Sequence, residues 1–346
     1  MAENLHAQNN PPAGNALEVD VRIDLNNENM YSTAPLTGHR HGQLHDVAQF
    51  EHRQLQVCRC VLYEVSKINL QNGRRYHAFH EGAYVLPNDE EEQDRIDLLH
   101  HIYRLLLGGE LFLAPIGANP QRVLDLGTGT GIWAIEFADQ YPSAQVIGTD
   151  LSPIQPRWVP PNCVFEIDNF ENDWVYSSKF DFIHGRELEG CVSDEDKLFA
   201  QAFHHLKSGG YFEFDGAYTY WLSDDDTAQK AENCQLLAAK IHEAANKFGK
   251  SFDNVPSWKA KMEKAGFVDV KEFVFKKPVG SWPKDPKMKE IGRLQQAQQL
   301  QAIQSYSSAL FSRVLGWSKP ELEVLLAKVR NELMDRSLHI VDQFLE

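Results

Sequence analysis

The sequence predicts an α/β fold in which helices cover both faces of a parallel β-sheet. Two observations support this prediction. Between Arg122 and Asp215, short apolar segments of strand length alternate with segments of helix length, which is the pattern of the strand–helix–strand units that form parallel sheets. A glycine-rich turn at residues 127–131 joins the first of these strands to the first helix. In open sheets of this kind, ligands bind beyond the carboxyl ends of the strands.

The expected elements follow in order along the chain. Residues 88–107 carry apolar side chains at helical spacing, with Asn88 or Asp89 as the cap and Gly108 and Gly109 at the end. The sheet region is expected to hold strands at 122–126, 145–150, 163–168, 180–184 and 210–215, and helices at 132–140 and 197–206. Beyond it we expect helices at 226–248, 257–265, 287–315 and 320–335, and strands at 267–276 and 338–345.

Composition divides the chain into three parts. Residues 1–45 are rich in Asn, Pro, Gly, Ala and His and show no hydrophobic period, so we expect a disordered tail. Residues 46–117 form an N-terminal helical or lid region, which contains a short basic and aromatic patch at 74–77. Residues 118–346 hold the sheet, and the helices at 285–335 are expected to form a cap inserted between its last two strands.

The net charge of the chain restricts the kinds of binding partner that the sequence predicts. Lys and Arg number 34 against 49 Asp and Glu, which gives a net charge of −15 and disfavours binding to nucleic acid or to anionic membranes. No run of about 20 apolar residues predicts a membrane span, and the polar N-terminus has no secretory signal pattern. We therefore expect a cytoplasmic protein, with the nucleus as the alternative. Neither the Cys58/Cys60 pair nor the histidines of the tail complete a metal site, so no metal is expected.

Three glycines at alternate positions form the most informative segment. Gly127 and Gly129 let the backbone turn tightly and approach a ligand, and Gly131 lets the helix pack close to the strand. The spacing differs from that of dinucleotide sites, and no Lys-Ser or Lys-Thr follows as in a phosphate-binding loop. Asp125, two residues before the first glycine, would repel a pyrophosphate and suits a ligand with a cationic amino group.

Two further strands are also expected to end in acids. Asp150 ends the second strand, where an acid accepts hydrogen bonds from ribose hydroxyls. Asp168 ends the third strand, and the following Asn169 and Phe170 suit the amino group and one face of an adenine ring. An amino-acid end, a ribose and a purine are the three parts of S-adenosylmethionine. The sequence thus predicts that this cofactor contacts Asp125, Gly127, Thr128, Gly129, Gly131, Asp150, Leu151, Asp168, Asn169 and Phe170.

The glycine turn resembles motif I of class I S-adenosylmethionine-dependent methyltransferases, and the wider pattern resembles the LaeA-like fungal methyltransferases. The matching segments are YVLPNDE (84–90) with Asp94-Arg95, LGTGTGIW (126–133), FDFIHGR (180–186), HLKSGGYFE (205–213), GSWPKD (280–285) and LGWS (315–318). The resemblance covers the chain from about Arg74 onward. It implies a Rossmann-like, seven-stranded sheet whose last two strands are antiparallel, with an N-terminal helical lid and a C-terminal helical insertion. It also implies S-adenosylmethionine as the methyl donor.

In the fold that the resemblance implies, the end of the fourth strand lies beside the sulfonium of the cofactor. His184, Arg186 and Glu187 are therefore the candidate catalytic residues. His184 is either a general base or a buried histidine of the core, and Arg186 pairs either with an acidic acceptor or with Glu187. Gly185 is expected to offer its carbonyl to the amino group of the cofactor. Tyr76 is expected to fold over the cofactor as part of a lid, together with Arg75 and Tyr84, although for Tyr84 a simple packing role is the alternative.

The predicted function is methyl transfer from S-adenosylmethionine to an oxygen of a small molecule, a carboxylate or a hydroxyl, in secondary metabolism. Aromatic residues that line the expected acceptor pocket are Tyr211, Phe212, Phe214, Tyr218, Tyr220 and Trp221. The alternative is a LaeA-like nuclear regulator that acts through velvet-type protein partners. The sequence leaves open whether the acceptor atom is O, N or C, and what the oligomeric state is.

Overall fold

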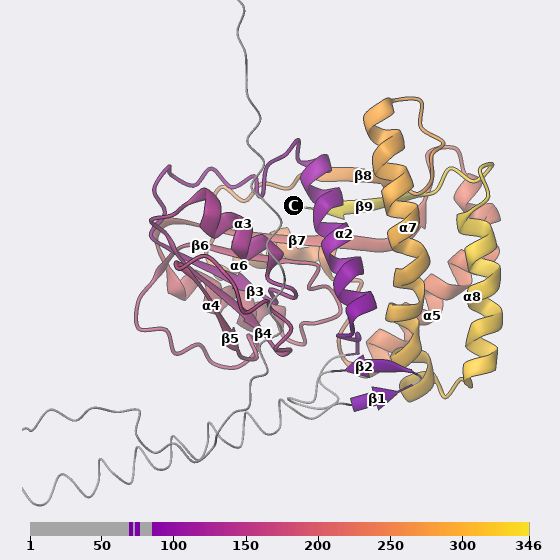
Figure 1. Cartoon of the computed structure of the whole chain (residues 1–346), viewed down its shortest axis with the longest axis horizontal. Helices are drawn as coiled ribbons and strands as arrows, with labels where there is room; N and C mark the ends of the chain where they lie inside the picture. The colour runs from indigo at the N-terminus through magenta and orange to yellow at the C-terminus, as the bar shows by residue number, and fades with distance from the viewer. Residues whose placement is uncertain (1–68, 72, 77–84, 346) are drawn as a thin grey trace, which may run out of the picture. The chain divides into compact units, whose positions relative to one another are not determined.

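The computed structural model describes residues 69–71, 73–76 and 85–345 (Figure 1). The predicted tail, the Cys58/Cys60 pair and Tyr84 lie outside these residues. In the described part of the chain, no helix is long and apolar enough to cross a membrane.

A seven-stranded sheet forms the centre of the structure, in the order β5-β4-β3-β6-β7-β9-β8. Its strands are β3 (Arg122–Leu126), β4 (Gln145–Asp150), β5 (Cys163–Ile167), β6 (Phe180–Arg186), β7 (Leu206–Leu222), β8 (Val274–Pro278) and β9 (Val341–Leu345). The first five run parallel, and β9 is antiparallel to both of its neighbours. The predicted Rossmann-like sheet with an antiparallel last pair is confirmed. Strand order reverses at β3, so a crevice opens at the carboxyl ends of the strands around it.

Helices pack on both faces of this sheet and at one end of it (Figure 1). They are α2 (Glu90–Leu106), α3 (Ile132–Gln140), α4 (Glu195–His205), α5 (Glu232–Phe248), α6 (Trp258–Ala265), α7 (Pro286–Ala309) and α8 (Lys319–Leu333). Asp89, rather than Asn88, caps α2, because its side chain accepts a hydrogen bond from the backbone N–H of Glu92. Glu90, Glu91 and Glu92 add negative charge at the positive end of the helix dipole.

The predicted helical insertion between the last two strands is present. It consists of α7, the π-helical segment η3 (Leu310–Leu315) and α8, which pack with α5 around one hydrophobic cluster. We call α5, α7, η3 and α8 the helical cap. In Figure 1 the helical cap stands beside the β8–β9 end of the sheet, and α2 lies between it and β3. Contacts between α2 and α7 therefore bring the N-terminal helix and the cap together.

Three details differ from the expectations. The fifth strand is longer than predicted, because β9 pairs with Gly216, Ala217, Tyr218 and Leu222 after the parallel pairing with β6 has ended. The strand expected at 267–276 begins only at Val274, since Phe267 packs on Phe203 and Phe212 instead of joining the sheet. A short hairpin, β1 (Asn69–Gln71) with β2 (Arg74–Tyr76), was not predicted.

Candidate active site

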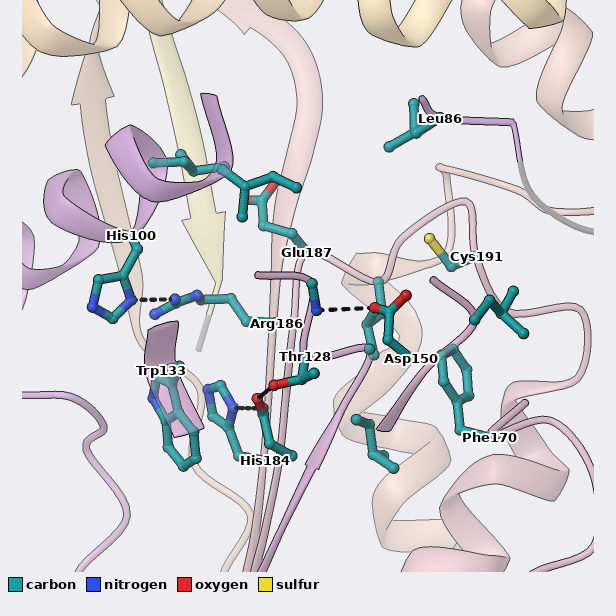
Figure 2. Close-up of a pocket in the computed structure, with 18 of the residues that line it drawn as sticks. Leu86, His100, Thr128, Trp133, Asp150, Phe170, His184, Arg186, Glu187 and Cys191 are labelled. Atoms are coloured by element: carbon teal, nitrogen blue, oxygen red, sulfur yellow. Dashed lines mark hydrogen bonds and ion pairs between the residues drawn. The ribbon is translucent and has the colours of Figure 1, made fainter. Parts of the chain in front are cut away.

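A cavity opens at the carboxyl ends of β3, β4 and β6, against α2 (Figure 2). The predicted residues that line it are Asp125, Gly127, Thr128, Gly129, Asp150, Leu151, Asn169, Phe170, His184, Arg186 and Glu187. Four others, Gly131, Asp168, Gly185 and Tyr76, do not line it. Residues that sequence reasoning missed come mainly from α2, where Arg95, Ile96, Leu99, His100 and Tyr103 face the cavity. We call this space the first cavity.

The glycine turn has the conformation that its residues predict. Gly127 and Gly129 have φ angles of +59° and +58°, in the left-handed region that side chains other than glycine rarely adopt. A Cβ on Gly127 would lie 2.4 Å from a methyl carbon of Leu188. The turn is closed by a hydrogen bond from the N–H of Thr128 to the carbonyl of Thr149 (2.9 Å).

Gly127→Ala is expected to destabilise the protein by about 2 kcal/mol, since a left-handed conformation costs an L-residue roughly 1–2 kcal/mol and Leu188 has to move. Urea unfolding measures the change. Gly117→Ala is the matched control, because Gly117 has no neighbouring atoms within 4 Å of a built Cβ and no positive φ. Equal effects of the two substitutions would contradict this account of the turn.

Asp150 is held in place at the end of β4. Its carboxylate accepts hydrogen bonds from the backbone N–H groups of Gly129 (2.9 Å) and Ser152 (2.8 Å). Burial raises the pKa of Asp150 to about 6, although these two N–H groups counteract part of that effect. The carboxylate is thus mainly ionised at pH 7 and presents hydrogen-bond acceptors to the cavity, beside Phe170 (Figure 2).

Asp125 and His184 form a buried pair. The Nδ1 of His184 lies 2.7 Å from one carboxylate oxygen of Asp125, and the hydroxyl of Thr128 donates to the other. On its far side, His184 Nε2 lies 3.6 Å from Asp215. The imidazole stacks on Trp133, with ring centroids 3.7 Å apart (Figure 2). Burial lowers the pKa of His184, and Asp125 counteracts part of this. Because His184 is 1% exposed and lies between two carboxylates, it fits the alternative of a buried core histidine better than that of a general base.

Arg186 and Glu187 make different contacts. Arg186 donates to Nδ1 of His100 (2.8 Å), and its guanidinium lies 4.8 Å from the centre of the Tyr103 ring. Burial, together with the charge of Arg186, lowers the pKa of His100 to about 2, so His100 is a neutral acceptor. The carboxylate of Glu187 accepts a hydrogen bond from the hydroxyl of Tyr103 and lies 3.8 Å from the ammonium of Lys277.

Glu187 also has a strained backbone. Its φ is +58°, a conformation that costs a residue with a side chain of order 1–3 kcal/mol and that clusters at functional sites. Lys277 and Tyr103, which hold its carboxylate, come from β8 and α2 and are joined by a hydrogen bond of 3.0 Å. Lys277 is only 2% exposed.

A second cavity adjoins the first, between the sheet and the helical cap. Three residues, Leu99, Glu187 and Tyr306, line both cavities. The remaining walls of the second cavity come mainly from β7, α5 and α7. Glu187 therefore stands at the boundary of the two spaces.

Comparison with known proteins now identifies the family. A family model described as a methyltransferase domain matches residues 98–272, which contain the five parallel strands of the sheet and most of the residues that line the first cavity. The chain belongs to the methyltransferase family. It is an S-adenosylmethionine-dependent enzyme, as the sequence resemblance implied.

Among its relatives, the methyltransferase pytC of Aspergillus terreus is 39% identical over 288 residues, which cover 83% of this chain and 89% of pytC. The secondary metabolism regulator LAE1 of Cochliobolus heterostrophus is 33% identical, covering 78% of this chain and 90% of LAE1. The protein-methionine methyltransferase laeA of Emericella nidulans is 34% identical, covering 80% of this chain and 74% of laeA. These matches confirm the resemblance to LaeA-like fungal methyltransferases.

Solved structures align only distantly. The cyclopropane synthase MmaA2 of Mycobacterium tuberculosis is 18% identical with a TM-score of 0.42, covering 71% of this chain and 82% of that one. The strand order of the methyltransferase, rather than this alignment, identifies its fold.

The predicted lid residue Tyr76 has a different environment. It is 2% exposed and belongs to the hydrophobic cluster of the helical cap, where the guanidinium of Arg313 lies 4.9 Å from its ring centre. Arg74, beside it in β2, forms an ion pair with Asp89 at 2.6 Å. The hairpin thus anchors the start of α2 and does not cover the first cavity.

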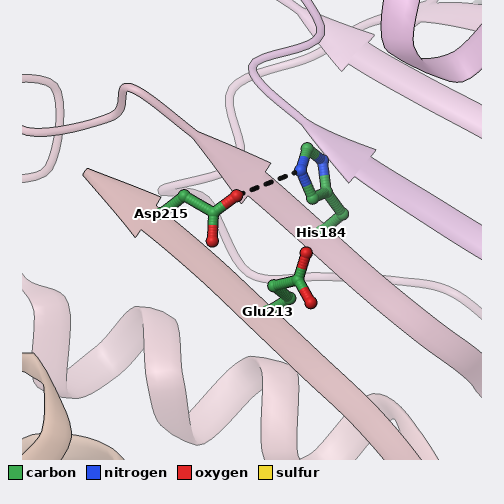
Figure 3. A group of neighbouring side chains, drawn as sticks. All are labelled: His184, Glu213 and Asp215. Atoms are coloured by element: carbon green, nitrogen blue, oxygen red, sulfur yellow. Dashed lines mark ion pairs between the residues drawn. The ribbon is translucent and has the colours of Figure 1, made fainter. Parts of the chain in front are cut away.

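His184, Glu213 and Asp215 point toward one another from β6 and β7 (Figure 3). Within the described residues, their ligand atoms form a group close enough to surround a metal ion. One oxygen of Glu213, however, accepts hydrogen bonds from the backbone N–H groups of Leu113 (2.9 Å) and Ala114 (2.5 Å). These bonds, and the pairing of His184 with Asp125, give the group a structural role in joining the loop at 113–114 to the sheet.

Proposed function

We propose that this methyltransferase transfers the methyl group of S-adenosylmethionine to a hydroxyl oxygen of a small molecule in fungal secondary metabolism. The observation that carries the proposal is the position of Glu187 on the shared boundary of two adjoining cavities. One cavity has the features of a nucleoside site, and the other is suited to an acceptor. A carboxylate at their junction is placed to receive the proton of an attacking hydroxyl.

The lining of the first cavity fits the cofactor. Asp150 would accept hydrogen bonds from the ribose hydroxyls, Phe170 and Leu151 would contact the adenine ring, and the turn at Gly127 and Gly129 would let the backbone approach the amino-acid end. When bound, the cofactor supplies a methyl group on a positively charged sulfur. His184 acts as a positioning residue, because it fixes the carboxylate of Asp125 next to this turn.

A hydroxyl acceptor suits Glu187 better than a carboxylate acceptor does. Methylation of a carboxylate requires no proton removal, and a carboxylate substrate would be repelled by the carboxylate of Glu187. A hydroxyl must lose its proton. Tyr103 and Lys277 keep Glu187 oriented for that step.

Glu187→Gln is expected to lower the rate of methyl transfer by about 100-fold or more, the usual contribution of a general base, without changing the affinity for S-adenosylhomocysteine. The assay follows labelled methyl groups from S-adenosylmethionine into products of a fungal metabolite extract. Glu166→Gln, an exposed change on β5, is the control and should leave the rate unchanged. A rate of Glu187→Gln close to that of the control would exclude Glu187 as the base.

A second candidate function is regulation of secondary metabolism through methylation of a protein. The observation in its favour is the similarity to LAE1 and to laeA, which is described as a protein-methionine methyltransferase. The same labelling assay separates the two candidates. Label in a small organic product supports the first, whereas label found only in protein supports the second.

A further inference from the structure

The second cavity has a volume of about 80 Å³ and apolar walls. Trp221, Phe252 and Ile303 line it, and each of these side chains is at least nine-tenths buried. They come from β7, the segment after α5, and α7. Walls of this kind accept the apolar body of a small molecule, with the few polar groups around them fixing its orientation.

Several polar side chains that line the second cavity lack hydrogen-bond donors for their oxygens. Within the described residues, the buried amide oxygens of Gln295 and Gln298 in this lining accept no hydrogen bond, and the buried carboxyl group of Glu189 has no side-chain donor, with only the backbone N–H groups of Glu189 and Ala217 directed toward it. Glu189, Gln295 and Gln298 are 5%, 1% and 2% exposed. A buried polar atom without a partner is rare in folded proteins. Each of these atoms is an acceptor, so the missing groups are hydrogen-bond donors.

The cations and amides nearby are already engaged. The ammonium of Lys277 lies beside Tyr103 and Glu187, and the amide nitrogens of Gln295 and Gln299 donate to Asp342 at 2.7 Å each. Burial raises the pKa of Glu189 well above its usual range, and the charge of Glu187 adds to this rise. Lys277 and the backbone N–H groups of Glu189 and Ala217 counteract only part of the effect.

We propose that the second cavity binds a nitrogen-bearing end of the methyl acceptor, whose N–H groups donate to Glu189 and Gln298. An ammonium group carries three donors and a hydroxyl only one, so an amine can satisfy several of these oxygens at once. The substrate class is then an apolar or aromatic amine that also carries a hydroxyl, with the hydroxyl toward Glu187. This inference rests on the proposed function, because it assigns the second cavity to the acceptor of the same reaction.

The test uses three probes of similar size: phenethylamine, 2-phenylethanol and phenylacetate. Isothermal titration into the full chain, saturated with S-adenosylhomocysteine, compares their affinities. We expect phenethylamine to bind at least about tenfold more tightly than 2-phenylethanol, which corresponds to one hydrogen bond to a charged group. Phenylacetate, which only accepts hydrogen bonds at its charged end, should not bind.

Two variants test whether the preference for phenethylamine depends on side chains that line the second cavity. Glu189→Gln keeps the shape of the side chain and prevents it from ionising beside an ammonium group, and Gln298→Met removes an acceptor at nearly constant volume. Each should lower the affinity for phenethylamine, Glu189→Gln by at least about tenfold, while binding of S-adenosylhomocysteine stays the same. Glu263→Gln is the control, because Glu263 is exposed on α6 and lines neither cavity.

Equal binding of the three probes, absence of binding by all of them, or preference for phenylacetate would overturn the inference. So would an amine affinity that Glu189→Gln leaves unchanged. The probe titrations are repeated without S-adenosylhomocysteine. A chain that binds phenethylamine through Glu189 but does not bind S-adenosylhomocysteine would count against the proposed function alone, so the two failures are distinguishable.

Discussion

Replacing Asp150 with alanine is expected to weaken the binding of S-adenosylhomocysteine by about 100-fold. Hydrogen bonds to a charged group contribute roughly 1.5–3 kcal/mol, and a tenfold change in affinity corresponds to about 1.4 kcal/mol. The substitution removes the acceptor for the ribose hydroxyls. It also releases the N–H of Gly129, which the carboxylate holds at 2.9 Å. Isothermal titration with S-adenosylhomocysteine measures the loss.

Asp168→Ala is the matched control for this experiment. Asp168 also follows a strand of the parallel sheet, but it is exposed and does not line the first cavity. Its carboxylate accepts a hydrogen bond from the N–H of Asn169. We expect its replacement to change the affinity by less than about threefold, in keeping with surface substitutions. Similar losses for the two variants would show that the cofactor site extends over Asp168 and that the first cavity is wrongly assigned.

Lys277→Met is expected to lower the free energy of unfolding by about 3–5 kcal/mol at pH 7, the usual cost of removing one partner of a buried ion pair. Lys277 is buried beside Glu187 and Tyr103, and its charge also counteracts part of the rise in the pKa of Asp342. Without it, buried carboxylates face one another. Because protonation of Asp342 removes its charge, the loss should become smaller as the pH falls.

Lys276→Met provides the control from the neighbouring position. Lys276 is half-exposed and pairs with the exposed Asp224, and such surface pairs contribute roughly 0–1 kcal/mol. Urea unfolding of both variants gives the comparison. If Lys277→Met were no more destabilising than Lys276→Met, the role of Lys277 in supporting Glu187 would have to be abandoned.

The parts of the site that lie within one strand and its following turn were predictable from sequence. Asp125 and Gly127 lie at the end of β3 and in the glycine turn, and Asp150 ends β4, the next strand along the chain. Short parallel strands bring these ends to one edge of the sheet. The conformation of the loop after β5 was harder to predict from the sequence. After β5 the chain turns so that Asn169 and Phe170, and not Asp168, face the first cavity.

The residues that sequence reasoning missed come from distant segments. Tyr103 lies on α2, a helix that the sequence predicts correctly. The spacing of the apolar residues in α2 does not show, however, which other element the buried face of this helix packs against. Lys277 lies one residue beyond the predicted strand 267–276, and its approach to Tyr103 spans 174 positions in the chain. Buried charges that depend on such long-range packing leave no local pattern, whereas glycines and strand-end acids do.

The insertion of α7, η3 and α8 between β8 and β9 separates two tasks that many enzymes combine in one set of loops. In the function proposed above, turns of the parallel sheet hold the donor, while Gln295 and Gln298 of α7 belong to a segment that leaves the sheet and returns to it. Under that proposal, substitutions at these two positions would alter which acceptor is methylated and leave the donor site unchanged. A scaffold arranged in this way would let related enzymes evolve new acceptors through changes in one inserted segment.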